Sequence, residues 1–332
     1  MLGISLFLVQ DVLPGSANGP LRVRNHFPAH LMFLTPTPDA PDLPGKNRFE
    51  ASFSIDYSSI FIYEKSPSWL AAMDMEMTVL EISLKYGLSE RLSLSANIPF
   101  VSMNSGFLDG FLADFHDTLG LPNYGRENRS ENDFLYVFKK DGKDWINSRS
   151  GGLHPGDIPI TLKAGLLDNK KILPPFSKTP ATISAALAYT LKLPVGNAER
   201  GFGSGKFDHG FFLISGFRKN AFSIYANPGF LLLADPDTKG AEISVNNVFA
   251  MLLGGEYQWN DRLSLIAQLN FYTSPFDNTR IHQLDVNSLE LGIGFAWWFK
   301  PDLNLEFAFC EDLTRSAPDF TVHLRLGYNF GF

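Results

Sequence analysis

Large apolar residues alternate with polar or small residues along most of the chain from residue 47 onward. Because successive side chains of a β-strand point to opposite faces, this pattern predicts strands with one apolar and one polar face. The last segment is the clearest case. Its apolar positions are Phe320, Val322, Leu324, Leu326, Tyr328, Phe330 and Phe332, and those between them are Thr321, His323, Arg325, Gly327, Asn329 and Gly331.

The same pattern recurs in regular units and predicts twelve strands. They are expected at residues 47–61, 74–87, 91–102, 156–167, 180–194, 208–218, 221–233, 246–259, 262–274, 287–299, 303–311 and 319–332. Tight polar turns are expected at Ser89-Glu90, Lys219-Asn220, Asn260-Asp261 and Lys300-Pro301-Asp302. Longer connections alternate with them, at 62–73, 103–155, 195–207, 234–245, 275–286 and 312–318, with an intermediate link at 168–179. This rhythm and an even number of strands are typical of a transmembrane β-barrel.

Alternation alone also fits a soluble β-sandwich or a lipocalin-like barrel with the apolar face inside. Three features favour a membrane barrel whose apolar face points outward into lipid. The strands are about 11–15 residues long, against about 5–6 in soluble proteins and about 9–11 needed to cross a bilayer. Aromatic residues gather at strand ends beside the short turns, as in an interfacial girdle: Tyr86, Tyr257, Trp259, Trp297, Phe299, Tyr328, Phe330 and Phe332. The opposite face carries charge at mid-strand.

The predicted fold class is therefore all-β: a closed antiparallel transmembrane β-barrel of about 12 strands, with short periplasmic turns and long outer loops. Its lumen-lining, candidate solute-binding residues are Glu50, Asp56, Glu81, Lys85, Lys163, Lys192, Glu290, Glu306, His323 and Arg325. Their charges nearly cancel, so we expect many of them to pair across the lumen. Such a barrel places the protein in the outer membrane of a Gram-negative bacterium, with outer-membrane lipid and lipopolysaccharide as its surroundings.

Composition narrows the function classes. Hydrophobic residues make up 45% of the 332 residues and charged residues 19%, which excludes a disordered chain. The net charge of −7 gives no reason to expect a nucleic-acid partner. The single cysteine excludes an intramolecular disulfide, and no Cys/His cluster has zinc-site spacing, so we expect no metal and no cofactor.

Residues 1–17 resemble a secretory signal. The short apolar run LGISLFLV is followed by Gly15-Ser16-Ala17, which suggests cleavage after about Ala17. No Lys or Arg precedes the run, so a start assigned too far downstream and an ordinary buried segment remain alternatives.

Residues 18–46 form a proline-rich segment with six prolines, which predicts neither strand nor helix. It is either a periplasmic tail or a plug that folds into the barrel, which residues 47–332 are expected to form. Arg22, Arg24 and Asn25 would suit a plug by pairing with lumenal acids. Small residues on the inward face of the last hairpins leave room for solute or for another part of the chain, or else they permit barrel curvature. These are Gly292, Gly294, Ala296, Gly327 and Gly331.

The long outer connection 103–155 holds two further predicted elements. Apolar residues at helical spacing predict an amphipathic helix over 107–118 that could cap the barrel mouth. The segment 134–146 is expected to form a hairpin with Asp141-Gly142 at its turn.

This connection also carries a family resemblance. The stretch GFLDGFLADFHDTLGLPNYGREN (106–128), with PLRVRN (20–25), resembles an uncharacterised domain-of-unknown-function family of bacterial outer-membrane barrels. Its motif includes Asp109, His116, Leu121-Pro122-Asn123 and Gly125-Arg126, so Asp109, His116, Asn123 and Arg126 are candidate binding residues of an outer loop. LKLPVGNAERGFGSGKFD (191–208) is similar to a loop of phenol-degradation and hydrophobic-compound uptake barrels. Phe332 resembles the C-terminal aromatic of outer-membrane proteins, which implies the barrel-assembly machinery as a partner.

No catalytic motif is present, so we expect no enzyme. The function predicted is a passive channel or uptake protein for a small or moderately hydrophobic solute. Two alternatives stay open. One is a structural or adhesive barrel with a sealed lumen. The other is a rim hydrolase that uses His116 with Asp109, Asp114 or Asp117.

Overall fold

A computed structural model describes residues 18–107, 110, 132–174, 179–238 and 240–330, and within these ranges the chain is dominated by strands. The strands are β1 (Phe49–Lys65), β2 (Trp69–Ser89), β3 (Leu92–Asn104), β4 (Leu135–Lys140), β5 (Lys143–Asn147), β6 (His154–Pro155), β7 (Ile158–Ile172), β8 (Ala181–Leu193), β9 (Asp208–Lys219), β10 (Phe222–Leu232), β11 (Val248–Gln258), β12 (Leu263–Tyr272), β13 (Ser288–Lys300), β14 (Leu303–Asp312) and β15 (Phe320–Phe330). The helices are α1 (Pro28–Leu31), the 3₁₀ turn η2 (Ala198–Arg200) and α3 (His282–Asp285).

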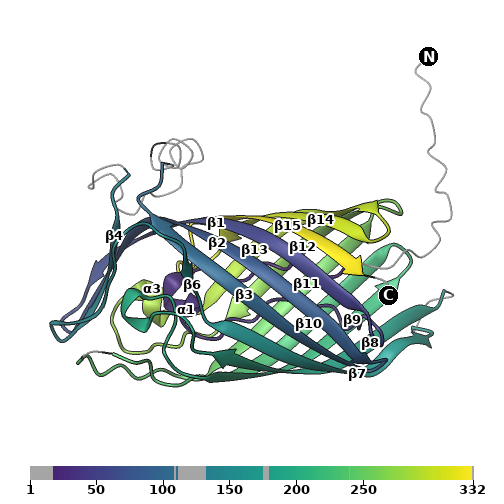
Figure 1. The fold of residues 1–332 in the computed structure, drawn as a ribbon, viewed down its shortest axis with the longest axis horizontal. Coiled ribbons are helices and arrows are strands. Elements are labelled where there is room, and N and C mark those ends of the chain that lie inside the picture. The colour runs from purple at the N-terminus through teal and green to yellow at the C-terminus, as the bar shows by residue number, and fades with distance from the viewer. Residues whose placement is uncertain (1–17, 108–109, 111–131, 175–178, 239, 331–332) are drawn as a thin grey trace, which may run out of the picture.

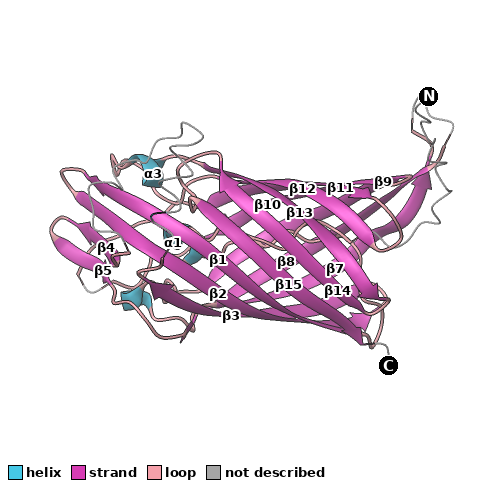
Figure 2. Ribbon diagram, turned by 90° about the horizontal axis from the view of Figure 1, so that it is seen from above, coloured by secondary structure: helices cyan, strands magenta, loops and turns pink. Residues whose placement is uncertain are grey.

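Twelve of the described strands close into one barrel (Figures 1 and 2). Neighbours along the chain pair antiparallel from β7 to β15, β15 pairs with β1, β1 with β2, β2 with β3, and β3 with β7. Strands β4, β5 and β6 lie outside this ring of twelve. Closure leaves the wall without a free edge along its length, which is what a sheet in lipid requires. The predicted fold class and all twelve strands are confirmed.

The apolar face of the wall points outward. Phe53 is 44% exposed and Leu326 is 46% exposed, whereas Asp56 and His323 on the alternate face are 4% and 0% exposed. Aromatic residues beside the short turns are also exposed, among them Tyr86, Trp259 and Trp297. A water-soluble protein does not expose a continuous apolar band, so this is the lipid-facing surface of a transmembrane barrel. In the described part of the chain, no helix is long and apolar enough to cross a bilayer.

The prediction of a long outer connection at 62–73 is wrong. β1 and β2 stay paired as far as Lys65 and Leu70, and only Ser66–Ser68 connect them. The reason lies in a distant segment, because Trp69–Asp74 also pair with the hairpin strand β4. This extra partner extends the β1–β2 hairpin beyond the rest of the wall.

The hairpin predicted at 134–146 is confirmed as β4 and β5. Asp141 and Gly142 at its tip have φ values of 50° and 75°, the left-handed pair that a two-residue hairpin turn requires. The helix predicted over 107–118 lies almost wholly outside the described residues.

Candidate functional site: the barrel interior and its N-terminal segment

Residues 18–45, here called the N-terminal segment, run through the barrel and back. Asn18 contacts Glu256 and Ser264, which flank the short turn between β11 and β12. Its middle reaches the opposite, long-loop end, where α1 lies near α3 (Figures 1 and 2). The segment returns to the short-turn end at Gly45. Gly45 lies so close to Gly87 of β2 that a Cβ atom on Gly87 would overlap the Gly45 carbonyl.

We call residues 18–27, before α1, the rising limb of the segment. This limb is held by hydrogen-bond acceptors on the barrel wall. The backbone N–H of Arg22 donates to Glu306 Oε1 at 2.5 Å, and the N–H groups of Asn18 and Gly19 donate to Glu256. The Arg24 guanidinium binds Glu81 Oε2 at 2.7 Å. An irregular backbone inside a barrel must find partners for its N–H groups, and the inward carboxylates provide them.

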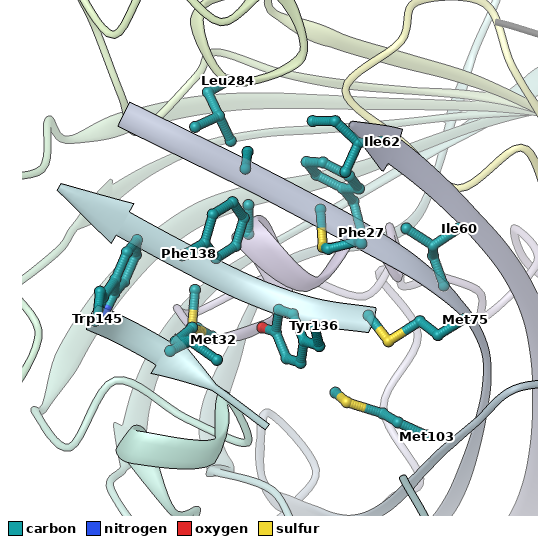
Figure 3. Packing of buried hydrophobic residues seen from close by; sticks show 14 of the residues in the cluster. Phe27, Met32, Ile60, Ile62, Met75, Met103, Tyr136, Phe138, Trp145 and Leu284 are labelled. Carbon is teal, nitrogen blue, oxygen red and sulfur yellow. The ribbon is translucent and has the colours of Figure 1, made fainter. Parts of the chain in front are cut away.

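The segment turns within an apolar cluster at the long-loop end. Figure 3 shows Phe27 and Met32 of the segment among Tyr136, Phe138 and Trp145 of the β4–β5 hairpin. Methionines Met73, Met75, Met77 and Met103 of β2 and β3 and Leu284 of α3 complete this packing. The turn contains α1, so the prediction that residues 18–46 hold no helix is wrong. Pro28 opens α1, where a proline needs no N–H partner.

Residues 32–45, after α1, form the returning limb of the segment, and Asp39 attaches this limb to the wall. Its carboxylate lies 2.6 Å from Lys163 Nζ, 2.8 Å from Arg22 Nη2 and 3.4 Å from Lys85 Nζ. Burial alone would raise the pKa of Asp39, but Lys163, Lys85 and Arg22 together hold that pKa well below its usual range. Because Arg22 belongs to the rising limb, Asp39 ties both limbs to each other and to the wall.

Lys192 forms a second buried centre of charge. Its ammonium lies 2.6 Å from Asp157 Oδ2 and 3.0 Å from Asp208 Oδ2, and it also donates to the carbonyl of Met32. Asp208 in turn accepts from the N–H of Leu34 at 2.9 Å. One cation therefore joins β8, β9 and the segment beside α1.

Glycines on the inward face of the wall make room for the segment. A Cβ atom added at Gly254 would lie 3.1 Å from Cβ of Pro20, and one at Gly216 would lie 3.1 Å from Cγ of Pro41. Gly292 likewise faces Leu21 at 3.6 Å, whereas a Cβ at Gly294 would overlap the Phe307 carbonyl of the next strand. Gly292 therefore leaves room for another part of the chain, whereas Gly294 lets the neighbouring strand approach closely.

The ten predicted lumen residues lie on the inward face, and they bind both the N-terminal segment and one another. Five of them contact the segment: Glu81, Lys85, Lys163, Lys192 and Glu306. Among the pairs within the set, His323 bridges Asp56 Oδ1 at 2.5 Å and Glu306 Oε1 at 3.1 Å. Glu50–Lys85 and Arg325–Glu306 are longer pairs, both at 3.9 Å. Glu290 has no ion-pair partner among the described residues. The loop candidates Asp109, His116, Asn123 and Arg126, together with Gly331 and Phe332, lie outside the described residues.

Sequence reasoning missed four acids that organise the interior: Asp39, Asp157, Asp208 and Glu256. Glu256 could have been found, because it falls on the inward face of β11 if the alternation is continued from Ala250 and Leu252. Asp157 and Asp208 lie at strand ends, where alternation fades. Asp39 lies in the irregular segment, where no periodicity marks the direction of a side chain.

Three cavities lie beside the returning limb. The one nearest the long-loop end, of about 20 Å³, is lined by apolar residues such as Phe33 and Val101 and by the charged Lys192 and Asp157. The middle cavity, of about 100 Å³, lies between Thr35–Asp39 and the wall. The cavity at the short-turn end, of about 340 Å³, borders Pro41–Leu43 and the strands β7 and β8.

Comparison with known proteins agrees with this architecture. Over residues 5–332 the chain matches a family described as a protein of unknown function, DUF3187, and it belongs to that family. No curated protein sequence matches it. A crystal structure of an outer-membrane channel from Pseudomonas putida F1 is similar, with a TM-score of 0.58 and 14% identity over 89% of this chain and 100% of that one. The toluene transporter TodX of P. putida aligns with a TM-score of 0.36 and 11% identity over 93% of each chain.

Proposed function

We propose that the protein is a passive channel of the Gram-negative outer membrane for a small or moderately hydrophobic solute. The observation that carries this proposal is the set of cavities beside the returning limb. We infer that they mark the path of a solute between the two ends of the barrel. Outer-membrane lipid and lipopolysaccharide would surround the wall, and Phe332 would direct assembly by the barrel-assembly machinery.

The lining of this route changes along its length. At the long-loop end the first cavity combines apolar residues such as Phe33 and Val101 with the buried Lys192 and Asp157. At mid-barrel the lining carries more charge, because Arg22, Lys85 and Arg325 line the middle cavity together with Asp39 and Glu50. A solute would meet both apolar and charged side chains in these cavities, which favours small molecules with one apolar and one polar part.

The N-terminal segment acts in this proposal as a plug that sets the width of the route. The cavities lie against its returning limb, so the position of that limb determines how wide they are. Asp39 is the main attachment of the limb. Its carboxylate lies 2.6 Å from the ammonium of Lys163, whose side chain is only 3% exposed.

The variant Lys163→Glu tests the channel and the plug together. The new carboxylate would face Asp39 and repel it, so we expect the returning limb to leave the wall. In planar bilayers this variant should conduct at least several-fold more than the native protein and should prefer cations. Lys170→Glu is the matched control, because Lys170 lies on the same strand and is exposed to solvent.

Uptake of a small neutral aromatic alcohol into proteoliposomes supplies the second readout. We expect uptake by the native protein and faster uptake by Lys163→Glu. If both proteins give no detectable current and no uptake, the channel proposal is wrong and a sealed, structural barrel replaces it.

A further inference from the structure

Three acceptor oxygens are buried together in the wall without a donor. Oε2 of Glu290, Oδ1 of Asn270 and Oε1 of Gln268 form no hydrogen bond with any described residue. Their residues are only 3%, 2% and 3% exposed. A buried acceptor without a partner is costly, and three of them side by side call for a positively charged or hydrogen-donating ligand.

Strand register places these side chains next to one another. Asn270 of β12 lies directly opposite Glu290 of β13, and Gln268 lies two residues along β12 on the same inward face. Opposite Gln268 is Gly292, which adds no side chain to the space between them.

The amide orientations are set by the N-terminal segment. The side-chain nitrogens of Asn270 and Gln268 both donate to the carbonyl oxygen of Val23, at 3.3 Å and 3.5 Å. Each amide therefore keeps its oxygen, and not its nitrogen, for a further partner.

A negative charge on Glu290 would have no counter-charge from the described chain. Within the described chain, no Lys, Arg or His forms an ion pair with Glu290. The residue directly opposite it on β14 is another acid, Asp312. Two other buried wall acids differ, because Glu81 binds Arg24 and Glu306 binds His323. Glu290 is thus a buried carboxylate whose counter-charge the protein does not provide.

We propose that Glu290, Asn270 and Gln268 bind a monovalent alkali cation such as K⁺ or Na⁺. One carboxylate balances one positive charge, and the two amide oxygens add neutral hard ligands. Mg²⁺ demands a near-ideal octahedron, and Ca²⁺ takes six to eight oxygens, so a set of three with one carboxylate suits a monovalent ion completed by water. The ion would orient the two amides that hold Val23 and so fasten the rising limb. This site does not depend on whether a solute crosses the barrel.

The first test is the thermal unfolding midpoint of the full chain folded in detergent. It is measured in KCl, in NaCl and in N-methylglucamine chloride at equal ionic strength. We expect the midpoint to rise with K⁺ or Na⁺ in a saturable way, by several degrees over N-methylglucamine. Glu290→Gln should lose this dependence, whereas Glu242→Gln, which changes an exposed acid, should keep it.

The second test locates the ion directly. Crystals of the native protein soaked in a Tl⁺ salt should show an anomalous peak between Glu290, Asn270 and Gln268, and Glu290→Gln crystals should lack it. A midpoint that is the same in all three salts, or native crystals without a peak at this position, would overturn the proposal and leave a proton or a water on Glu290.

Discussion

At the scale of single residues, Lys192 is the side chain on which the most buried charge depends. Its ammonium is the cation for both Asp157 and Asp208, and all three side chains are at most 3% exposed. Replacing Lys192 with Met would leave two buried carboxylates without compensation, which costs about 3–5 kcal/mol for one broken buried pair. The check is urea unfolding of detergent-folded protein, in which Lys192→Met should unfold at clearly lower urea. An unfolding curve like that of the exposed-site control Lys170→Met would contradict this role.

Alternation predicted which charged residues face inward but not what they bind. The inward direction of Glu81, Glu306 and Lys163 follows from strand period alone. Their partners Arg24, Arg22 and Asp39 lie in a segment without regular secondary structure, so no periodicity relates the two sets. The expectation that these charges pair with one another agrees with His323, Asp56 and Glu306. It misses the partners in the N-terminal segment, because the sequence does not show that the lumen is occupied.

At the scale of the element, β11 carries two adjacent glycines with opposite surroundings. A Cβ at Gly254 would lie 3.1 Å from Pro20, whereas one at Gly255 would meet nothing nearer than a carbonyl oxygen at 3.8 Å. We expect Gly254→Val to push the rising limb from the wall and Gly255→Val to leave it in place. Trypsin cleavage after Arg22 or Arg24, followed by mass spectrometry of folded barrels, reports the difference. Equal protection of both variants would show that this limb does not pack on β11.

The strands themselves were predictable because lipid on one side and a polar interior on the other enforce strict alternation. The errors occur where that constraint ends. Beyond the bilayer, residues 69–74 acquire a partner in β4, more than sixty positions along the chain, and the β1–β2 hairpin extends through most of the predicted loop. Inside the barrel, four residues from Pro28 form α1 because the apolar cluster around Phe27 and Met32 packs both sides of the turn.

At the scale of the whole molecule, acid should loosen the N-terminal segment. Burial lowers the pKa of His30 to about 4. Burial also lowers the pKa of His26 to about 4; the nearby Asp56 carboxylate opposes this shift, and Arg24 and His323 add to it. Between pH 6.5 and 4 a released segment therefore takes up protons that the packed one does not, so its release becomes more favourable as pH falls, by roughly tenfold per pH unit for each histidine.

Open probability in planar bilayers, recorded from pH 7 to pH 4.5, measures this effect. It should rise through that range in the native protein and more weakly in His30→Gln, whose amide can still bond to Ser316. Asp39 cannot cause the change, because its lowered pKa keeps it ionised throughout this window. A flat profile would assign the two histidines no part in holding the segment, and the same slope in His30→Gln would exclude His30.

The central claim is that the N-terminal segment lies inside the barrel wall, and a cysteine pair tests it most directly. In a Cys310→Ala background, Pro20→Cys combined with Gly254→Cys would place two Cβ atoms close to bonding range for a disulfide, since the present separation is 3.1 Å. Pro20→Cys with Gly255→Cys, whose side chain would face lipid, is the matched control. The account predicts a spontaneous disulfide in the folded barrel for the first pair, seen by mass spectrometry, and free thiols for the second. Free thiols in both pairs would place the segment elsewhere and contradict the account.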